Sequence, residues 1–370
     1  MSSNSKHPEN SDKYKGLNVN KGIEAPPTVN PNIANRLKNI KRHHHNVDDY
    51  VNGILKGDIS LLAQAITMVE SSRREHQEIA QQIIERCLPE SGRSVRIGIT
   101  GVPGAGKSTF IEAFGNHLCN NQHKVAVLAI DPSSELSKGS ILGDKTRMET
   151  LSNKENAFIR PSPSAGTLGG VARKTRESMI LCEAAGFDII IVETVGVGQS
   201  ETAVKSMVDF FLLLKIAGAG DELQGIKRGI MEMADAIAIN KADGNNIPKA
   251  QLAKAQFQNA LHLFPPHESG WDPKVLLCSS IEETGIEDIW KCVTEYTEKT
   301  NKSNYFEVNR REQAKYWMYE TINERLKSDF YNDNVVKSAL SETEKNVLED
   351  KISSFIAAQK LLDSYYSKIN

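Results

Sequence analysis

The amino-acid sequence predicts a chain of the α/β class, with a doubly wound, mainly parallel sheet and helical segments at both ends. Three observations support this prediction. Short, near-continuous apolar runs alternate with helix-like segments between residues 93 and 300. Helical apolar patterns without such runs occupy residues 36–92 and 301–370. Residues 1–35 hold Ser, Asn, Lys and Pro in no periodic order, and we expect a disordered tail there.

The composition of the 370 residues excludes several classes of protein. Lys and Arg number 45 against 47 Asp and Glu, so the net charge is −2 and nucleic acid is not expected as a partner. The five cysteines include no Cys-x-x-Cys pair, which is typical of reduced thiols in a cytoplasmic protein. No apolar stretch is long enough to cross a membrane, and the tail resembles neither a secretory signal nor a mitochondrial presequence.

The predicted strands are six apolar runs. Each is almost entirely apolar because a parallel sheet is covered by helices on both faces. The runs are residues 95–99, 125–130, 189–192, 210–214, 236–239 and 275–277.

The two helical segments show apolar residues at helical spacing. In the first segment one helix begins after Asp58, a favourable N-cap, and the last one stops before Pro89. The second segment carries a stripe of Tyr319, Ile322, Leu326 and Phe330. Such a helical pair packs either against a second subunit or back on its own domain, and the sequence favours neither.

The strongest motif lies between the first predicted strand and the helix that follows it. The segment matches the complete phosphate-binding pattern G-x-x-x-x-G-K-[ST], and this setting predicts a P-loop NTPase fold. Glycines let backbone amides turn toward phosphate oxygens at a helix N-terminus. Lys107 is expected to reach the β- and γ-phosphates, and the Ser108 hydroxyl to ligate Mg²⁺. The predicted nucleotide-binding residues are Gly101, Val102, Pro103, Gly104, Ala105, Gly106, Lys107, Ser108 and Thr109.

A second motif, N-K-x-D, follows the predicted strand 236–239 and indicates guanine. The carboxylate of Asp243 can accept hydrogen bonds from N1–H and the exocyclic amine of guanine, a pattern that adenine does not offer. The aliphatic part of Lys241 can cover the base plane. The loop after the last predicted strand is expected to contact guanine through its backbone. The predicted base-binding residues are Asn240, Lys241, Asp243, Ser279, Ser280 and Ile281.

Three acidic residues are candidates for the metal site, together with Ser108. Asp131 and Glu193 each follow a predicted strand, and Asp144 lies in a polar segment. Carboxylates at the carboxyl ends of parallel strands, beside a phosphate loop, are where a hydrated Mg²⁺ is expected. With Lys107 they form the predicted catalytic group. GTPases commonly have Asp in a D-x-x-G pattern where this chain has Glu193. For each acid the alternative to a metal ligand is a solvated residue at a strand end or in a loop.

Two polar segments surround these acids, residues 137–147 and 195–201. Segments with few apolar side chains are candidates for loops that the γ-phosphate orders and that hydrolysis releases. Gln199 could orient the attacking water and Arg147 could contact phosphates, although their spacing fixes neither role.

The order of these motifs resembles the MeaB/ArgK family of P-loop GTPases, which are associated with methylmalonyl-CoA mutase. The most specific segments are GSILGDKTRM at residues 139–148 and ETVGVGQSE at residues 193–201. The resemblance extends from about residue 36 to the C-terminus. Lys138 is a departure, because family members usually have glycine there.

The resemblance implies a slow GTPase, binding GTP and GDP with Mg²⁺, that forms a homodimer through its C-terminal helices. It also implies a partner, an adenosylcobalamin-dependent methylmalonyl-CoA mutase, whose cofactor loading the family gates and which it protects or reactivates. Two alternatives remain. A kinase of an amino-acid transport system would need an acceptor motif, which we do not find. A metal-insertion GTPase would need a Cys/His cluster, which the scattered cysteines do not provide.

Overall fold

The computed structural model describes residues 45–130, 148–161, 168–194, 200–217 and 228–367. One compact unit spans Asn46–Asn370. The predicted metal ligands Asp131 and Asp144 lie outside the described residues, as do Arg147, Gln199 and the tail 1–35.

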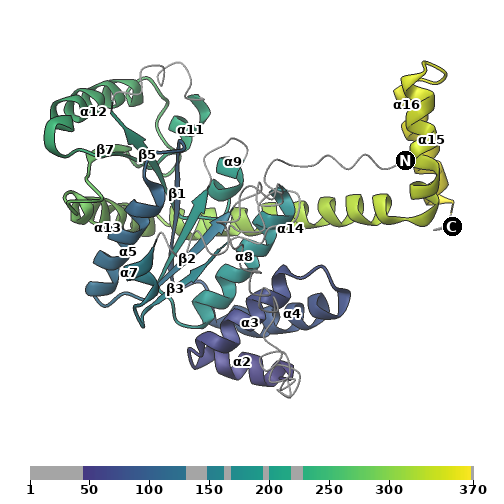
Figure 1. Cartoon of the computed structure of the whole chain (residues 1–370), viewed down its shortest axis with the longest axis horizontal. Coiled ribbons are helices and arrows are strands. Elements are labelled where there is room, and N and C mark those ends of the chain that lie inside the picture. Colours follow the sequence, from purple (N-terminus) through teal and green to yellow (C-terminus); the bar gives the residue numbers. More distant parts are fainter. Residues whose placement is uncertain (1–44, 131–147, 162–167, 195–199, 218–227, 368–370) are drawn as a thin grey trace, which may run out of the picture. The chain divides into compact units, whose positions relative to one another are not determined.

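The described residues form a parallel sheet of seven strands in the order β3-β2-β4-β1-β5-β6-β7 (Figure 1). Every pair of neighbours is parallel. This confirms the predicted α/β fold and the six apolar runs. The strands are β1 (Val95–Gly101), β2 (Val125–Ile130), β3 (Ala157–Arg160), β4 (Ile189–Thr194), β5 (Phe210–Ile216), β6 (Ala236–Asn240) and β7 (Lys274–Leu277).

Edge strand β3 was not predicted: only Phe158 of its four residues is buried, and its apolar run, residues 157–159, is short. At the centre, β1 lies between β4 and β5, so its carboxyl end adjoins the carboxyl ends of both. The strand order thus places the phosphate-loop motif beside the residues that end β4.

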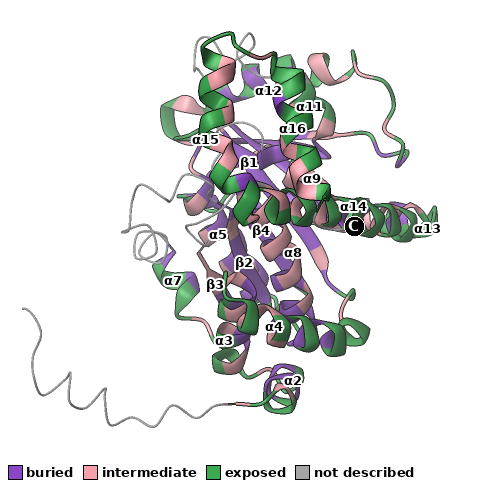
Figure 2. Cartoon of the chain, turned by 90° about the vertical axis from the view of Figure 1, so that its right-hand side faces the viewer, coloured by how far each residue is buried: buried purple, intermediate pink, exposed green. Residues whose placement is uncertain are grey.

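Helices cover both faces of the sheet, and the strands between them are buried (Figure 2). One face carries Ile97, Ile99 and Leu212, which pack with the helices α5 and α13. The other face carries Phe211 and Val192, which pack with α8 and the residues around α9. The helices between the strands are α5 (Lys107–Asn120), α7 (Glu149–Ser152), α8 (Leu168–Ala184), α9 (Ser200–Lys205), α11 (Arg228–Met233) and α12 (Ile247–Leu261), with a short 3₁₀ helix at Gly244–Asn246. Helix α13 (Ile286–Lys302) follows the last strand.

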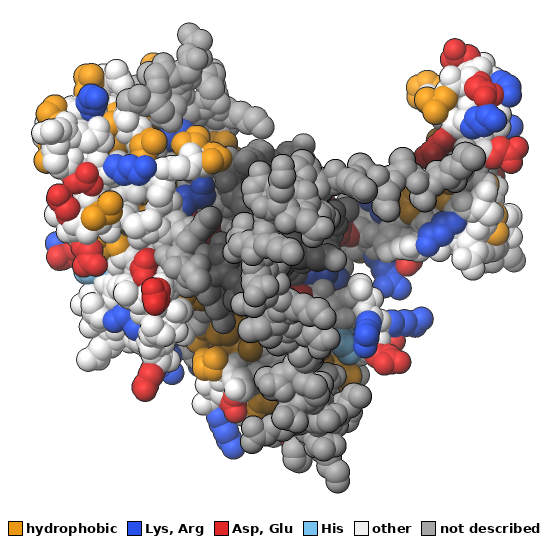
Figure 3. All heavy atoms as spheres, viewed as in Figure 1, with side chains coloured by type: hydrophobic (Ala, Val, Ile, Leu, Met, Phe, Trp, Pro, Cys, Tyr) orange, Lys and Arg blue, Asp and Glu red, His pale blue; other side chains and the backbone are white. Residues whose placement is uncertain are grey.

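The C-terminal segment forms three helices, α14 (Tyr305–Asn332), α15 (Asn334–Leu348) and α16 (Ser354–Tyr366). On α14 the buried side chains are Phe306, Gln313 and Trp317. The predicted apolar stripe lies farther along, and within this chain it is largely uncovered: Leu326 is 60% exposed. Figure 3 shows hydrophobic side chains among charged ones at the surface of α15 and α16.

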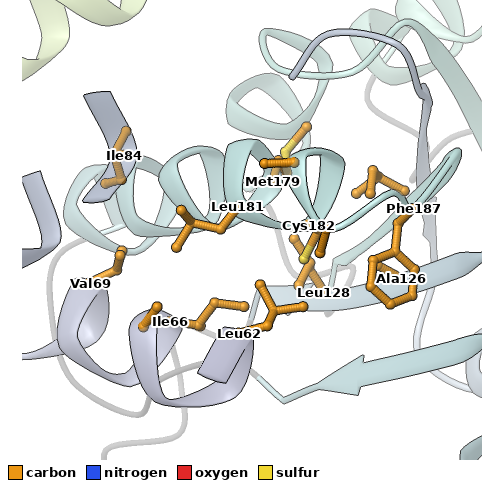
Figure 4. Packing of buried hydrophobic residues seen from close by; sticks show 14 of the residues in the cluster. Leu62, Ile66, Val69, Ile84, Ala126, Leu128, Met179, Leu181, Cys182 and Phe187 are labelled. Carbon is orange, nitrogen blue, oxygen red and sulfur yellow. The ribbon is translucent and has the colours of Figure 1, made fainter. Parts of the chain in front are cut away.

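The N-terminal segment forms α2 (Val47–Leu55), α3 (Ile59–Glu70) and α4 (Arg74–Cys87), followed by a 3₁₀ turn at Leu88–Glu90. Asp58 caps α3 by accepting from the amides of Ser60 and Leu61, as predicted. These helices bury their apolar faces against α8 and β2. Figure 4 shows Leu62, Ile66 and Val69 of α3 beside Leu181 and Cys182 of α8 and Leu128 of β2.

Candidate functional site

The phosphate-loop motif joins β1 to α5 as a tight turn. Gly104 and Gly106 have φ of 84° and 86°, a left-handed conformation that favours glycine. A Cβ on Gly106 would lie 2.8 Å from Asn240 Nδ2, so this position also needs glycine for space. Lys107 begins α5, and its Nζ donates to the carbonyls of Gly101 at 2.7 Å and Val102 at 3.3 Å. The loop therefore has the conformation that the motif predicts.

Lys107 is a buried cation close to two carboxylates. Its side chain is only 9% exposed, and burial lowers its pKa below the usual lysine value. The negative charges of Glu193 and Glu201 oppose that effect. Glu201 is 2% exposed in the first turn of α9, and the sequence predicted no role for it. Its position beside the lysine depends on how α9 packs, which no local motif reveals.

Ser108 and Glu193, two of the predicted metal ligands, lie together. The Ser108 hydroxyl donates to Glu193 Oε1 at 3.2 Å. Glu193 pairs in register with Ile99 of β1 and Ala129 of β2, near the carboxyl end of the sheet. The next residue, Thr194, donates from its hydroxyl to that of Thr100 at 2.8 Å. This hydrogen bond joins the carboxyl end of β4 to β1, the strand that leads into the phosphate loop.

The predicted base-binding loop contacts the phosphate loop directly. Asn240 Nδ2 donates to the carbonyl of Ala105 at 3.0 Å, and Lys241 Nζ donates to that of Gly104 at 3.0 Å. The side-chain Oδ1 of Asn240 in turn accepts from the backbone amide and the hydroxyl of Ser280, at 3.1 and 2.8 Å. Asn240 thus joins three segments that are far apart in the sequence.

Asp243 is held at the outer side of the same cluster. Its Oδ2 accepts from the Ser279 hydroxyl at 2.6 Å, so the carboxylate is oriented by the loop after β7. Ile281 is 80% exposed at the surface of that loop. The structure therefore brings together every predicted base-binding residue.

Residues 62–334 match the protein family described as Methylmalonyl Co-A mutase-associated GTPase MeaB. The matched stretch contains the phosphate loop, β4, α9 and the base-binding loop. The chain belongs to the MeaB family of GTPases. Like its family, it is a GTPase, and GTPases are hydrolases.

Similar proteins agree with this assignment. GTPase ArgK of Escherichia coli is 46% identical over 313 residues, which is 82% of this chain and 95% of that protein. The mitochondrial methylmalonic aciduria type A homolog of Mus musculus is 44% identical over 332 residues, 87% of this chain and 80% of that protein. A crystal structure of an LAO/AO transport system kinase superposes with a TM-score of 0.68 and 37% identity, covering 86% of this chain and 96% of the other.

The described residues of this MeaB family member have two further properties, which concern metal-binding clusters and membrane-spanning helices. Among them, no group of three or more His, Cys, Asp or Glu side chains is placed to hold a metal ion. None of the helices in the described ranges is both long and apolar enough to cross a membrane.

Proposed function

We propose that this MeaB family GTPase is a chaperone for an adenosylcobalamin-dependent acyl-CoA mutase of the methylmalonyl-CoA mutase type. It gates cofactor loading and protects or reactivates the mutase. The observation that carries the proposal is the match to a family described as mutase-associated, over residues 62–334. That match extends beyond the nucleotide site into helices at both ends, which supply surface for a partner.

The phosphate end of the site is assigned to Lys107, Ser108 and Glu193. Lys107 binds the β- and γ-phosphates from its place within the loop, where burial strengthens its electrostatic interactions. The adjacent oxygens of Ser108 and Glu193 fit Mg²⁺, which prefers hard oxygen ligands. Bound Mg²⁺ would supply positive charge that offsets the charge of the phosphates. Asp131 and Asp144 complete this proposed set from outside the described residues.

The base end of the site is assigned to Asp243 and the residues that hold it. Because Ser279 orients the Asp243 carboxylate, its oxygens meet the two donors of guanine without a prior rearrangement. Asn240 fixes the loop to the phosphate-binding turn, and Lys241 covers the base. The backbone of Ser280 and Ile281 closes the edge of the base pocket.

A homodimer is part of the proposal, formed through the C-terminal helices. Exposed apolar side chains follow one another along them, including Tyr319 (54%), Leu326 (60%) and Phe355 (85%). Exposed apolar side chains in such number along one segment are typical of an interface. Leu326→Asp should convert the dimer to a monomer in size-exclusion chromatography with light scattering; a wild-type monomer would contradict this part. A cytoplasmic location completes the proposal, since five buried thiols fit a reducing compartment.

The test of function is GTP turnover with and without a purified methylmalonyl-CoA mutase. We expect inorganic phosphate to be released from GTP with no acceptor present, and the rate to change when the mutase is added. A rate that the mutase leaves unchanged, with no complex formed, would contradict the chaperone function. Phosphate that moves onto an added amino-acid-binding protein, without release, would instead favour the transport-kinase alternative.

A further inference from the structure

Helix α14 holds the short segment that joins α9 to β5. The indole Nε1 of Trp317 donates to the Ser206 carbonyl at 3.0 Å, and Gln313 Nε2 donates to the Val208 carbonyl at 2.7 Å. Both side chains are only 6% exposed. The Trp317 ring belongs to the same core cluster as Val204 of α9. Two successive turns of α14 therefore fix the backbone directly after α9.

The other end of α9 lies at the nucleotide site. Its second residue is Glu201, a buried carboxylate whose charge acts on the Lys107 ammonium. The helix has six residues and spans about 9 Å at 1.5 Å per residue. It also packs on β1 and β4, the strands that lead into the phosphate loop and carry Glu193. Ser206, which directly follows α9, is thus only one short helix away from Glu201.

We propose that Trp317 and Gln313 are positioning residues for GTP hydrolysis, acting through α9 to place Glu201 beside the phosphate loop. By linkage, a position of α14 that favours the GTP complex over the GDP complex is in turn favoured when GTP is bound. The C-terminal helices thereby report which nucleotide is bound. This inference uses the GTPase activity of the family and does not depend on the mutase partner.

Arg310, one turn before Gln313, has a different contact. It binds Asp209 and the carbonyls of Gly92 and Ser94, at the amino end of the sheet. Because Asp209 directly follows Val208, this contact holds the end of the same connection, next to β5. Trp317 and Gln313 hold Ser206 and Val208, nearer to α9, and their hydrogen bonds can be removed while the ion pair of Arg310 stays.

Two conservative variants of the full chain test the proposal. Trp317→Phe keeps an aromatic ring and removes the N–H donor, and Gln313→Met keeps the length of the side chain and removes its donor. Each loses one hydrogen bond, so we expect kcat for GTP to fall by about fivefold. The Kd for GDP should change by less than twofold. Tyr316→Phe is the matched control, because Tyr316 is 46% exposed on the same helix, and its kcat should equal that of the wild type.

A spectroscopic readout separates positioning from loss of structure. The difference in tryptophan fluorescence between wild type and Trp317→Phe isolates the signal of Trp317 from those of the other two tryptophans. We expect that signal to differ between the GDP complex and the complex with a non-hydrolysable GTP analogue. The proposal is overturned if the signal is the same in both complexes, or if both variants keep kcat within twofold of wild type. Parallel loss of kcat and GDP affinity would also overturn it. If the wild-type protein did not hydrolyse GTP, the GTPase activity would be refuted. The fluorescence comparison would still test the coupling between the bound nucleotide and α14.

Discussion

Arg310 of α14 and Asp209, the residue before β5, form a buried bidentate ion pair. Nε and Nη2 of the arginine donate to the two carboxylate oxygens at 2.8 and 2.6 Å. The side chains are 10% and 2% exposed. Arg310 also donates to the carbonyls of Gly92 and Ser94. One side chain of the C-terminal segment is thus bound to two parts of the GTPase core.

Removing this arginine should destabilise the protein strongly. Arg310→Ala leaves Asp209 buried without its main cation, and we expect the free energy of unfolding to fall by about 3 kcal/mol. Urea unfolding followed by circular dichroism measures it. The matched control is Arg325→Ala, whose pair with Asp329 is largely exposed and should contribute less than about 0.5 kcal/mol. Equal losses in the two variants would contradict the role of the buried pair.

A second buried pair predicts how stability depends on pH. Burial alone would raise the pKa of Glu183, but hydrogen bonds and charge from Arg96, with further hydrogen bonds from Ser94 and Gly92, lower it below the usual value. Arg96 Nε lies 2.7 Å from the carboxylate. Because the folded pKa is depressed, ionised Glu183 stabilises the fold above its unfolded pKa of about 4.3, and this stability is lost as pH falls through the folded value.

The corresponding variant is Glu183→Gln. It should be less stable than wild type at neutral pH, and its free energy of unfolding should fall less steeply between about pH 5 and pH 3. Thermal or urea unfolding at several pH values measures both slopes. A variant with the slope of the wild type would show that another carboxylate dominates acid unfolding.

The phosphate loop gives a direct prediction for nucleotide binding. Lys107→Ala removes the one side-chain cation that the loop directs at the phosphates, and GTP affinity should fall by about 100-fold or more. Isothermal titration with GTP and GDP measures it. Lys291→Ala, an exposed lysine of α13, is the control and should bind like wild type. Undiminished GTP affinity in Lys107→Ala would refute the assignment of the site.

Replacing one carboxylate oxygen of Asp243 by an amide nitrogen, in Asp243→Asn, should change which base the protein prefers. Asn in its place presents one donor and one acceptor to the two donors of guanine, so GDP affinity should fall by at least about tenfold. Xanthine has a carbonyl where guanine has the amine, so XDP should bind the Asp243→Asn variant better than GDP. Competition between the two nucleotides measures this preference. Asp272→Asn, at an exposed position, should leave it unchanged.

Much of this fold could be predicted from local patterns. The apolar runs of a two-sided sheet and the complete phosphate-loop motif are continuous in the sequence, and each predicted strand is present. The hydrogen bond from Asn240 to Ala105 joins residues 135 positions apart. No spacing rule reveals such a contact, although the sequence assigned both motifs to one nucleotide.

The packing of α14 shows where apolar periodicity fails. The stripe at Tyr319, Ile322 and Leu326 was the visible pattern, yet these side chains are exposed. The face that packs on the core contains Arg310 and Gln313, whose polar groups bind backbone carbonyls and Asp209. Because a search for apolar spacing ignores polar residues, it could not identify this face of α14, and only the structure does.

If this protein gates cofactor loading of a mutase, as we propose, its affinity for that mutase should depend on the bound nucleotide. The most direct measurement is the Kd for purified methylmalonyl-CoA mutase, by isothermal titration, with GDP and with a non-hydrolysable GTP analogue. A switch requires a difference in affinity between the two states, and we expect at least a fivefold difference, in line with typical coupling free energies of about 1 kcal/mol or more. Equal Kd values in the two nucleotide states, or no binding in either, would contradict the account.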